Sequence, residues 1–421
     1  MNVLLVNPPI YDFAAHDFWL KPYGLIHIAG ILKKAGIESI HFFDFMDRHI
    51  FPHAKSDRYG RGKFFSIEVE RPNVLSFVPR KFKRYGAPME FFHRYLSQIP
   101  APDFVLISTG MTYWYLGVRE VMDEIRGIFP GAKIVLGGIY SSILPDHARI
   151  ELQPDHIFTG LRSLSNFMGL SGLNGSSSPL WDVYKRLDYG VIKLTDGCPF
   201  RCTYCAVWIL TPRFRIRKIE QVLDEIKYFK KRGIHDIVFY DDALLVNPER
   251  GILPLLERVS GMNLRFHTPN ALHARFITME VAHAMREAGF ETIYIGYETT
   301  DIVRQKRTGG KVTSEHFYNA IENLLSTGFR REQITVYLMM GLPGQPPEEV
   351  EQGMREIAEL GLKIMLSEYS PIPGTPDGER AREILDISDP LLQNNIVFPI
   401  AYYGYDTVKR LKALKNKLNR Q

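Results

Sequence analysis

The chain has 421 residues, of which 45% are hydrophobic and 24% charged, and its formal net charge is +5 at pH 7. This length exceeds one ordinary domain, so we expect two domains, each with a substantial core. Basic and acidic residues are interspersed, which does not favour a nucleic acid as partner, and no apolar run is long enough to span a membrane. Three cysteines cannot form a disulfide framework and suit a metal site in a reducing compartment, so we expect a cytoplasmic protein.

The first third of the chain alternates short apolar runs with helical patterns. Over 23–37, Leu25 and Leu32 fall on one face of a helix that Gly36 ends, and a second helix is expected over 118–131. This alternation predicts a parallel sheet in a doubly wound, Rossmann-like α/β fold. The expected strands are 2–9, 39–45, 103–109, 133–138 and 156–160.

Residues 48–97 interrupt the alternation and are rich in Arg, Lys, Phe and Tyr. We expect an insertion in the first domain (1–165), which is either a surface elaboration with buried aromatic side chains or a lid with a role in substrate binding. The stretch GLSGLNGSSSP (169–179) is the clearest linker in the chain, so we place the domain boundary within 166–183.

After the linker, a strand–helix unit repeats six times, with helices such as 218–232 and 346–360. Six units predict an open fraction of a (β/α) barrel over 184–376, followed by a short helical C-terminal segment over 377–421. Ligands of such sheets bind at the carboxyl ends of the strands. The expected strands are 189–195, 236–242, 264–268, 292–298, 334–341 and 363–371.

All the cysteines of the chain, Cys198, Cys202 and Cys205, stand in the stretch TDGCPFRCTYCAV directly after the first strand of the barrel. The spacing Cys-x3-Cys-x2-Cys offers three ligands, and no histidine lies nearby to complete a tetrahedral zinc site, which is the alternative. Three thiolates would hold three irons of a 4Fe–4S cluster and leave the fourth iron open to a substrate or cofactor. Open coordination indicates catalysis, whereas closed coordination would indicate an electron carrier or sensor.

This motif, with Tyr204 directly before the third cysteine, resembles the signature of the radical S-adenosylmethionine (SAM) superfamily. The resemblance covers the whole second domain. It implies that the open iron chelates SAM and that an electron cleaves SAM to methionine and a 5′-deoxyadenosyl radical. It also implies that Tyr204 lies beside the adenine, and that an electron donor such as flavodoxin or ferredoxin is a partner.

Polar and small residues follow the later strands of the expected barrel. The resemblance implies that Asp241 and Asp242 hold the methionine amino group of SAM or line the substrate site, and that Glu298 bonds the ribose or methionine moiety. A capped strand–helix turn is the alternative for the two aspartates, and a tight turn for the glycine–proline stretches. Further candidates for ligand contacts are Asn270, His273, Arg275, Gly341, Pro343, Gly344, Pro371, Ile372, Pro373 and Gly374.

The first domain resembles the cobalamin-binding domain that precedes the radical SAM domain in one large subfamily. The matching stretches are VLLVNPP, YGLIHIAGILKKAGI, PDFVLISTG and FPGAKIVLGGIY. Glycines at strand ends would let a large ring approach the backbone. The resemblance implies that the strand ends bordering the cobalamin are Ser108, Thr109, Gly137 and Gly138.

One departure leaves a cobalamin-free domain as an alternative. The cobalt-ligating pattern Asp-x-His-x-x-Gly of many cobalamin proteins is absent, because Asp12 and His16 have the wrong spacing. Tyr113, Trp114 and Tyr115 follow a strand end, where they could cover a corrin face or a substrate or pack in the core.

No further cysteine exists to hold a second cluster or to relay a methyl group, which argues against methylthiotransferases and maturases with auxiliary clusters. Cobalamin could carry the methyl group instead. We therefore expect a radical SAM enzyme that methylates an unactivated carbon of a small-molecule substrate with cobalamin. The alternative is a radical rearrangement, cyclisation or oxidation without functional cobalamin, and a non-enzymatic iron–sulfur electron-transfer protein is the third reading.

Overall fold

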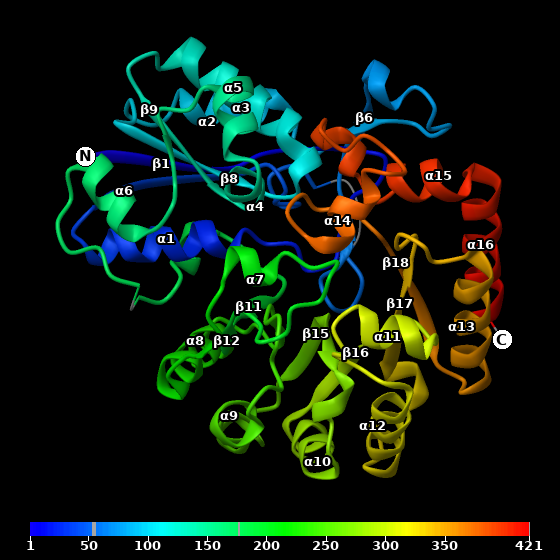
Figure 1. Cartoon of the computed structure of the whole chain (residues 1–421). Coiled ribbons are helices and arrows are strands. Elements are labelled where there is room, and N and C mark those ends of the chain that lie inside the picture. Colours follow the sequence, from blue (N-terminus) through cyan, green and yellow to red (C-terminus); the bar gives the residue numbers. More distant parts are fainter. Residues whose placement is uncertain (53–55, 176, 421) are drawn as a thin grey trace. The chain divides into compact units, whose positions relative to one another are not determined.

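The computed structural model describes residues 1–52, 56–175 and 177–420. The chain divides into two compact units, unit 1 (Met1–Leu187) and unit 2 (Asp188–Gln421); Figure 1 colours them along the sequence. Part of the expected insertion (53–55), Ser176 of the expected linker and Gln421 lie outside the described residues, and the expected domain bounds stay a prediction. Among the described residues, no helix is long and apolar enough to cross a membrane.

In the described part of unit 1, five parallel strands form a sheet in the order β10-β9-β8-β1-β4, which we call the N-terminal sheet. Each strand corresponds to an apolar run in the sequence, because a strand buried on both faces needs continuous rather than alternating apolar residues. The doubly wound α/β arrangement is thereby confirmed. The strand bounds are β1 (Asn2–Asn7), β4 (Ser39–Asp44), β8 (Phe104–Thr109), β9 (Lys133–Gly138) and β10 (His156–Ile157).

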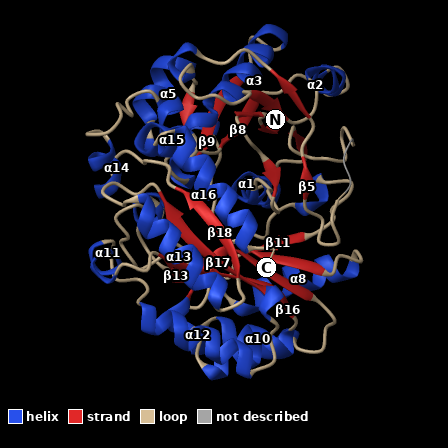
Figure 2. Cartoon of the chain, turned by 90° about the vertical axis from the view of Figure 1, so that its right-hand side faces the viewer, coloured by secondary structure: helices blue, strands red, loops and turns tan. Residues whose placement is uncertain are grey.

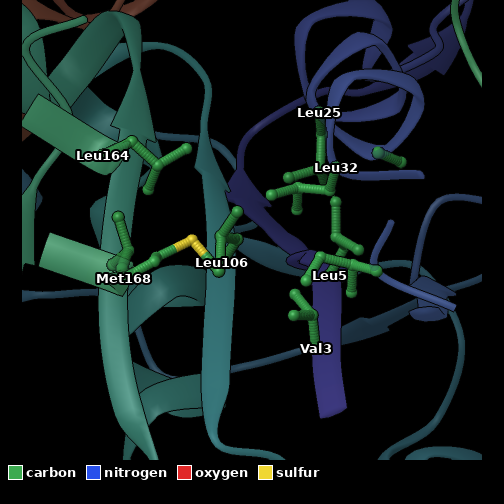
Figure 3. Packing of buried hydrophobic residues seen from close by; sticks show 10 residues of the cluster. Val3, Leu5, Leu25, Leu32, Leu106, Leu164 and Met168 are labelled. Atoms are coloured by element: carbon green, nitrogen blue, oxygen red, sulfur yellow. The ribbon is translucent and has the colours of Figure 1, made fainter. Parts of the chain in front are cut away.

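Helices cover both faces of the N-terminal sheet. α1 (Tyr23–Lys34) and α6 (Leu161–Met168) pack on one face, and α3 (Tyr115–Ile128) contacts β8 from the other. Short helices α4 (Ile139–Ile143) and α5 (Pro145–Leu152) follow β9. Figure 3 shows the core under α1 and α6, with the labelled side chains Val3, Leu5, Leu25, Leu32, Leu106, Leu164 and Met168.

The insertion is built from short antiparallel strands and one helix, and its aromatic side chains are buried or half-buried except Phe77, which is 45% exposed. Phe92 of the helix packs against Phe43 and Phe45 with ring centroids 4.9 and 5.0 Å apart. A surface elaboration with buried aromatics therefore describes its packing, while a lid role stays a prediction. The elements of the insertion are β5 (Gly62–Lys63), β6 (Ser66–Glu68), β7 (Lys83–Tyr85) and α2 (Met89–Leu96). Two strands that precede the insertion pair with it: β2 (Ile10–Asp12) with β7, and β3 (His16–Asp17) with β5.

The Gly- and Ser-rich stretch after α6 is anchored on α1. His27 Nε2 lies 2.9 Å from the carbonyl oxygen of Ser177. A Cβ atom at Gly30 of α1 would collide with the carbonyl oxygen of Ser178, so this close approach requires glycine. The described residues of this stretch thus belong to unit 1.

In the described part of unit 2, six parallel strands form the C-terminal sheet in chain order, β11-β14-β15-β16-β17-β18. The helices between them lie along the outside of this sheet (Figures 1 and 2). The expected open fraction of a (β/α) barrel is confirmed, and all strands end at one edge, which we call the carboxyl edge. The strands are β11 (Gly190–Ile192), β14 (Asp236–Phe239), β15 (Arg265–His273), β16 (Phe290–Glu298), β17 (Ile334–Met340) and β18 (Lys363–Glu368). The helices are α8 (Ile219–Lys231), α9 (Ile252–Val259), α10 (Met279–Ala288), α11 (Ile302–Arg307), α12 (Ser314–Ser326) and α13 (Pro347–Glu359).

The C-terminal segment is helical, as expected. It comprises α14 (Pro376–Ala381), α15 (Val397–Tyr403) and α16 (Tyr405–Leu418). The Asn419 side chain fastens its end to β18, because it accepts from Ile364 N at 2.8 Å and donates to Ile364 O at 2.9 Å.

Candidate active site

The three cysteines lie in a loop at the carboxyl edge of the C-terminal sheet, after β11. Two short strands, β12 (Thr195–Asp196) and β13 (Arg215–Ile216), pair antiparallel and close the base of this loop, residues 197–214, which we call the cysteine loop. Gly197 begins the loop with a φ of 73°, and a Cβ atom there would lie 2.8 Å from the carbonyl oxygen of Thr211. Both the conformation and the space therefore require glycine.

The three thiols are free and are buried or half-buried. Backbone N–H groups donate to two of them: Val207 N to Cys205 Sγ at 3.5 Å, and Phe200 N to the thiol of Cys198. Burial raises the pKa of all three thiols, that of Cys205 to about 11. The thiolate forms that bind metals therefore need a positively charged partner.

Lys311 supplies a positive charge beside the thiols. Its Nζ lies 2.9 Å from Glu298 Oε1, and the two side chains are only 14% and 11% exposed. Burial by itself would lower the pKa of Lys311, but the Glu298 carboxylate and the Cys202 thiol raise it above its ordinary value. The Lys311 charge in turn opposes the effect of burial on the pKa of each thiol. The carboxyl edge thus holds a buried ion pair next to the cysteine loop.

Glu298 reaches this position through a strained backbone. It ends β16 with a φ of 69°, where the pairing of β16 with β17 shifts register. Its carboxylate folds back over Gly296, where a Cβ atom would lie 2.6 Å from Oε1. A non-glycine residue in the left-handed region costs roughly 1–3 kcal/mol and persists only where its surroundings hold it. The strand end is therefore shaped to aim this carboxylate toward Lys311.

Two other segments hold the cysteine loop in place. Thr203 N donates to Thr308 O at 3.2 Å, and a Cβ atom at Gly309, whose φ is 117°, would lie 3.2 Å from Cys202 Cα. Thr203 O accepts from Asp377 N at 3.0 Å, and its hydroxyl donates to the Asp377 carboxylate. The loop after α11 and the start of α14 therefore both position the thiols.

Asp241 lies buried at the end of β14. Its Oδ1 accepts from Leu194 N at 2.9 Å, and from the backbone N and the hydroxyl of Thr195. Its Oδ2 is buried without a hydrogen-bond partner, and burial raises its pKa to about 6. Burial also raises the pKa of Asp242, whose charge acts on the thiol of Cys198. A capped turn accounts for one oxygen of Asp241 and leaves the other one available to a ligand.

Of the three candidates on β15 and directly after it, His273 is buried beside the cysteine loop and Asn270 is exposed, while Arg275 lies near Phe200. His273 is buried, its Nδ1 has no hydrogen-bond partner, and burial lowers its pKa well below the ordinary value. The ring of Phe200, in the cysteine loop, stands edge-on to it at 5.1 Å. Asn270 is exposed and donates to Tyr240 O at 3.1 Å, and the Arg275 guanidinium lies 5.4 Å from the Phe200 ring centre. His273 therefore borders the cysteine loop as a neutral imidazole.

The glycine–proline stretch after β17 makes close contacts within the chain. Gly341 has a φ of 95°, and a Cβ atom there would lie 3.2 Å from Pro399 Cγ. Gly344 N donates to the hydroxyl of Tyr402 at 3.0 Å, and the Pro343 carbonyl accepts from two arginines of α11. A role of these residues toward a cofactor stays a prediction.

The stretch after β18 turns tightly into α14. The Ile372 carbonyl accepts from the hydroxyl of Thr375 at 2.7 Å, and Gly374 has a φ of 82°. Pro371 is buried and Pro373 half-buried. Their contact with an adenine stays a prediction.

The side chain of Tyr204 extends from the cysteine loop and packs against an apolar cluster at the ends of β17 and β18. Its hydroxyl shares a hydrogen bond with Cys202, and burial raises its pKa well above the ordinary value. An aromatic ring in this position suits a flat apolar ligand. The buried members of the cluster are Met339, Leu342, Tyr369, Ala381 and Phe398.

In unit 1, the four candidates lie side by side at the carboxyl ends of β8 and β9, where Ser108 pairs with Gly137 and Thr109 with Gly138. A Cβ atom at Gly138, whose φ is 111°, would collide with the carbonyl oxygen of Thr109, so the chain itself requires this glycine. Ile139, directly after Gly138, is 39% exposed.

The aromatic run after β8 packs inside unit 1. Trp114 Nε1 donates to Asp12 Oδ2 at 2.7 Å, Tyr113 is buried, and Tyr115 stacks on a tyrosine of α4. His16 is exposed on β3. Core packing therefore accounts for the three aromatic side chains.

Cysteine thiolates hold either a single metal ion or an iron–sulfur cluster. Within the described ranges, no three His, Cys, Asp or Glu side chains lie close enough together for a single metal ion. A 4Fe–4S cluster is larger than an ion and takes thiolates that stand farther apart. Three free thiols, two N–H donors to sulfur and a buried lysine fit such an anionic group.

The family model described as the radical SAM superfamily matches residues 192–357. This range contains the three cysteines, Glu298 and Lys311. The chain carries a radical SAM domain. The match confirms the resemblance to the radical SAM superfamily that the cysteine spacing indicated. The relatives of this domain are enzymes.

Two curated relatives show how far the likeness extends. An uncharacterized methyltransferase of Pyrococcus horikoshii is 25% identical over 246 residues, which are 57% of this chain and 50% of that protein. An anaerobic magnesium-protoporphyrin IX monomethyl ester cyclase of Cereibacter sphaeroides is 21% identical and covers 95% of this chain and 66% of its own. The chain therefore spans about half the length of the first relative and about two thirds of the second.

A solved structure shares the fold of nearly the whole chain. The radical SAM methyltransferase TsrM of Kitasatospora setae, with cobalamin and a [4Fe-4S] cluster bound, matches 98% of this chain and 89% of its own with a TM-score of 0.69 and 16% identity. A second structure of TsrM, with tryptophan and a SAM analogue, gives a TM-score of 0.66 at 17% identity over 90% of this chain and 76% of its own. The Rossmann-type unit before the radical SAM domain is thus a known combination.

Sequence reasoning missed several residues that build the edge of the radical SAM domain. Lys311, Gly309 and Asp377 come from segments that carry no spacing motif, and Thr203 is one of the variable positions between the cysteines. The stretch TGGK (308–311) was the available signal, because two glycines before a single lysine indicate a close backbone approach.

Proposed function

We propose that this protein is a radical SAM enzyme that binds a 4Fe–4S cluster through Cys198, Cys202 and Cys205 and methylates an unactivated carbon of a small-molecule substrate with cobalamin. The observation that carries the proposal is the placement of the three thiols beside the buried Lys311–Glu298 pair at the carboxyl edge. A parallel sheet presents its ligands at this edge, so thiols, charges and an aromatic ring converge where a cofactor would bind.

The cluster, when bound, supplies the electron that cleaves SAM, so that SAM and one electron give methionine and a 5′-deoxyadenosyl radical. The chain's own groups would hold the two reactants. The orphaned Oδ2 of Asp241 would accept from the methionine ammonium group, since an unpaired buried acceptor gains most from a charged donor. The Tyr204 ring would lie along the adenine, and Lys311 would balance the negative charge of the thiolates.

The small-molecule methylation rests on unit 1 and on the cysteine count. Cobalamin, when bound, would carry the methyl group, because the chain has no cysteine outside the cysteine loop to do so. The exposed side chain of Ile139, directly after Gly138, would face the ring, while the hydroxyls of Ser108 and Thr109 lie at the same strand ends. TsrM, whose fold this chain shares, has cobalamin bound in its solved structure.

The first experiment measures 5′-deoxyadenosine. Anaerobically reconstituted full-length protein, reduced with dithionite and given SAM, should form 5′-deoxyadenosine above a no-enzyme control. If none forms with or without candidate substrates, the enzyme proposal is wrong.

The second experiment tests the ligands. Cys202→Ala should lose the brown visible absorbance and most of the iron of the reconstituted protein, because two thiolates cannot hold the cluster. Thr203→Ser, a neighbour that keeps its hydroxyl, is the control and should retain the iron.

The third experiment separates two reactions. Protein produced with added cobalamin and freed of unbound ligand should contain close to one cobalt per chain. Cobalt at background would favour the second candidate, a radical rearrangement, cyclisation or oxidation without functional cobalamin. The alignment of 95% of this chain with the protoporphyrin ester cyclase supports a cyclisation.

A further inference from the structure

Arg275 carries a positive charge at the carboxyl edge that no acid balances. It lies in η5 (Ala274–Phe276), directly after β15, and its side chain is half-buried. Within the described ranges, its guanidinium forms no ion pair and no hydrogen bond, and its contact is with the ring of Phe200, whose centre is 5.4 Å away. A ring face offsets the charge of a guanidinium only in part. The N–H groups of Arg275 therefore remain available to an anion.

His273 is a second group without a partner beside this guanidinium. Its Nδ1 is buried and has no hydrogen-bond partner in the part of the chain that the structure describes. Its ring stands edge-on to Phe200 at 5.1 Å, and the ring centre of Phe276 is 6.2 Å from both. A buried polar atom without a hydrogen bond is costly, and a bond to a ligand would remove that cost.

The start of α12 adds a third group. η5 packs against α12, and the charge of Arg275 acts on His316 in the first turn of this helix. Nδ1 of His316 lies 3.0 Å from the hydroxyl of Thr313, the N-cap residue, so Nε2 is the nitrogen left for a ligand. Glu315, the acid of this turn, is exposed. We call Arg275, His273 and His316 the arginine site.

The balance of charge indicates which anion fits the arginine site. Lys311, another cation nearby, is already paired with Glu298. Burial and the neighbouring cations lower the pKa of His273 and His316, so both imidazoles are neutral near pH 7 and act as hydrogen-bonding groups. The site thus offers one positive charge, that of Arg275. A carboxylate carries one negative charge, and its two oxygens match the fork of a guanidinium, whereas a phosphate monoester carries close to two charges.

We propose that the arginine site binds a carboxylate of the small-molecule substrate, with the guanidinium of Arg275 on both oxygens. Phe200 and Phe276 would contact the apolar part of the substrate next to the carboxylate. Phe200 lies between Cys198 and Cys202 in the sequence, so the substrate is anchored directly beside the cysteine loop. The proposal rests on the proposed function, because it names the class of substrate for that same site: a carboxylic acid with an apolar body.

The test uses two probes of the same shape. 3-Phenylpropionate joins one carboxylate to one aromatic ring, and 3-phenylpropionamide lacks the charge. Each is titrated by calorimetry into reconstituted full-length protein that contains SAM. The acid should bind about tenfold more tightly than the amide, because a hydrogen bond to a charged group is stronger than one to a neutral group. A wild type that binds acid and amide equally, or binds neither, would overturn the proposal.

Three variants locate the preference for the acid. Arg275→Leu should weaken acid binding about tenfold and leave amide binding unchanged, whereas a loss of packing alone would weaken both. Arg275→Lys keeps the charge without the fork and should keep part of the preference. Arg286→Leu is the matched control, because Arg286 also lies over a phenylalanine ring, 5.7 Å from the centre of Phe329, but ends α10 just before β16, at the opposite edge of the sheet. Equal effects of the two leucine variants would contradict the assignment.

Two further measurements distinguish other occupants and the proposed function. Phenyl phosphate should bind more weakly than the acid; tighter binding would overturn the choice of a carboxylate. In equilibrium dialysis, the acid should leave bound labelled SAM in place, and displacement would show that the arginine site holds the carboxylate of SAM instead. A wild type that forms no 5′-deoxyadenosine with dithionite would refute the proposed function, while the preference for acid over amide, measured without turnover, tests the arginine site on its own.

Discussion

At the scale of single residues, the charge of Lys311 is central to the cysteine loop. Its ammonium group pairs with Glu298 and acts on the pKa of all three thiols. Removing one partner of a buried ion pair leaves an uncompensated charge, which costs roughly 3–5 kcal/mol. Lys311 therefore affects both the stability of the carboxyl edge and the pKa of the thiols.

Lys311→Met should lower the iron and sulfide bound per chain and weaken SAM affinity about 10-fold or more, since groups that support metal ligands contribute on this scale. The readouts are iron and sulfide analysis after anaerobic reconstitution and equilibrium dialysis with SAM. Lys311→Arg keeps the charge and should recover most of both. Full iron content and SAM affinity in the methionine variant would contradict this role.

Asp241 gives the molecule a distinct pH dependence. Burial raises its folded-state pKa to about 6 from an ordinary 3.8, so the folded protein retains a proton that the unfolded chain releases between these values. The free energy of unfolding therefore falls as the pH rises through this window. Asp241→Asn removes this titration but keeps an oxygen acceptor for Leu194 N and Thr195.

We expect Asp241→Asn to be more stable than the wild type at pH 7 by about 1–3 kcal/mol and similar to it near pH 4, at roughly 1.4 kcal/mol for each unit of pKa shift. Urea unfolding of the cluster-free protein at several pH values measures the difference. A parallel pH dependence of the two proteins would show that Asp241 does not titrate in this range.

At the scale of elements, the cysteine loop takes its shape from three neighbouring segments. β12 and β13 close its base, the turn after α11 supports one side and the start of α14 the other. Gly309 and Gly310 stand in that turn with φ values of 117° and 60°, but only a Cβ atom at Gly309 would meet the Cys202 backbone.

Gly309→Ala should therefore destabilise unit 2 by about 1–3 kcal/mol and reduce cluster content, because the alanine can neither adopt this φ nor fit beside Cys202. Gly310→Ala is the matched control and should cost only about 1 kcal/mol, since its φ lies in the ordinary left-handed region with open space around it. Thermal unfolding and iron analysis compare the two. Equal effects would show that contact with the loop is unimportant.

At the scale of the whole molecule, each unit has its own sheet and hydrophobic core. The core under α1 and α6 consists of residues of unit 1, whereas the cluster around Tyr204 consists of residues of unit 2. Units with separate cores can lose stability separately.

Leu106→Ala removes a buried side chain from the centre of the N-terminal sheet and should lower the stability of unit 1 by about 2–5 kcal/mol. Iron content and 5′-deoxyadenosine formation with dithionite, both assigned to unit 2, should stay near wild type at temperatures below the first unfolding transition. Calorimetry and iron analysis on the same sample test this. A loss of iron in parallel with unit 1 stability would show that the two units do not act independently.

The sequence alone predicted the strands of both parallel sheets and several of the helices between them, but not α2, α4, α5 and α6. Apolar runs and helical spacing indicate which residues of a local stretch of chain are buried. A strand of a parallel sheet is buried on both faces, so its sequence is a continuous apolar run that is easy to recognise. The short strands of the insertion and the β12–β13 pair escaped prediction, because two or three residues are too few for a recognisable alternation. The three cysteines were readable for the same reason as the strands, since their spacing is local.

Only the tertiary structure brought the supporting groups to the thiols. Thr203 and Asp377 are separated by 174 residues, and Lys311 lies more than a hundred residues after Cys205, the last thiol that its charge affects. A parallel barrel collects every strand end at one edge, so residues distant in sequence become neighbours there. No local pattern states which of them will meet. The cysteine spacing thus indicated which kind of metal group the chain can bind, and the folding of the sheet decided which charged side chains surround the thiols.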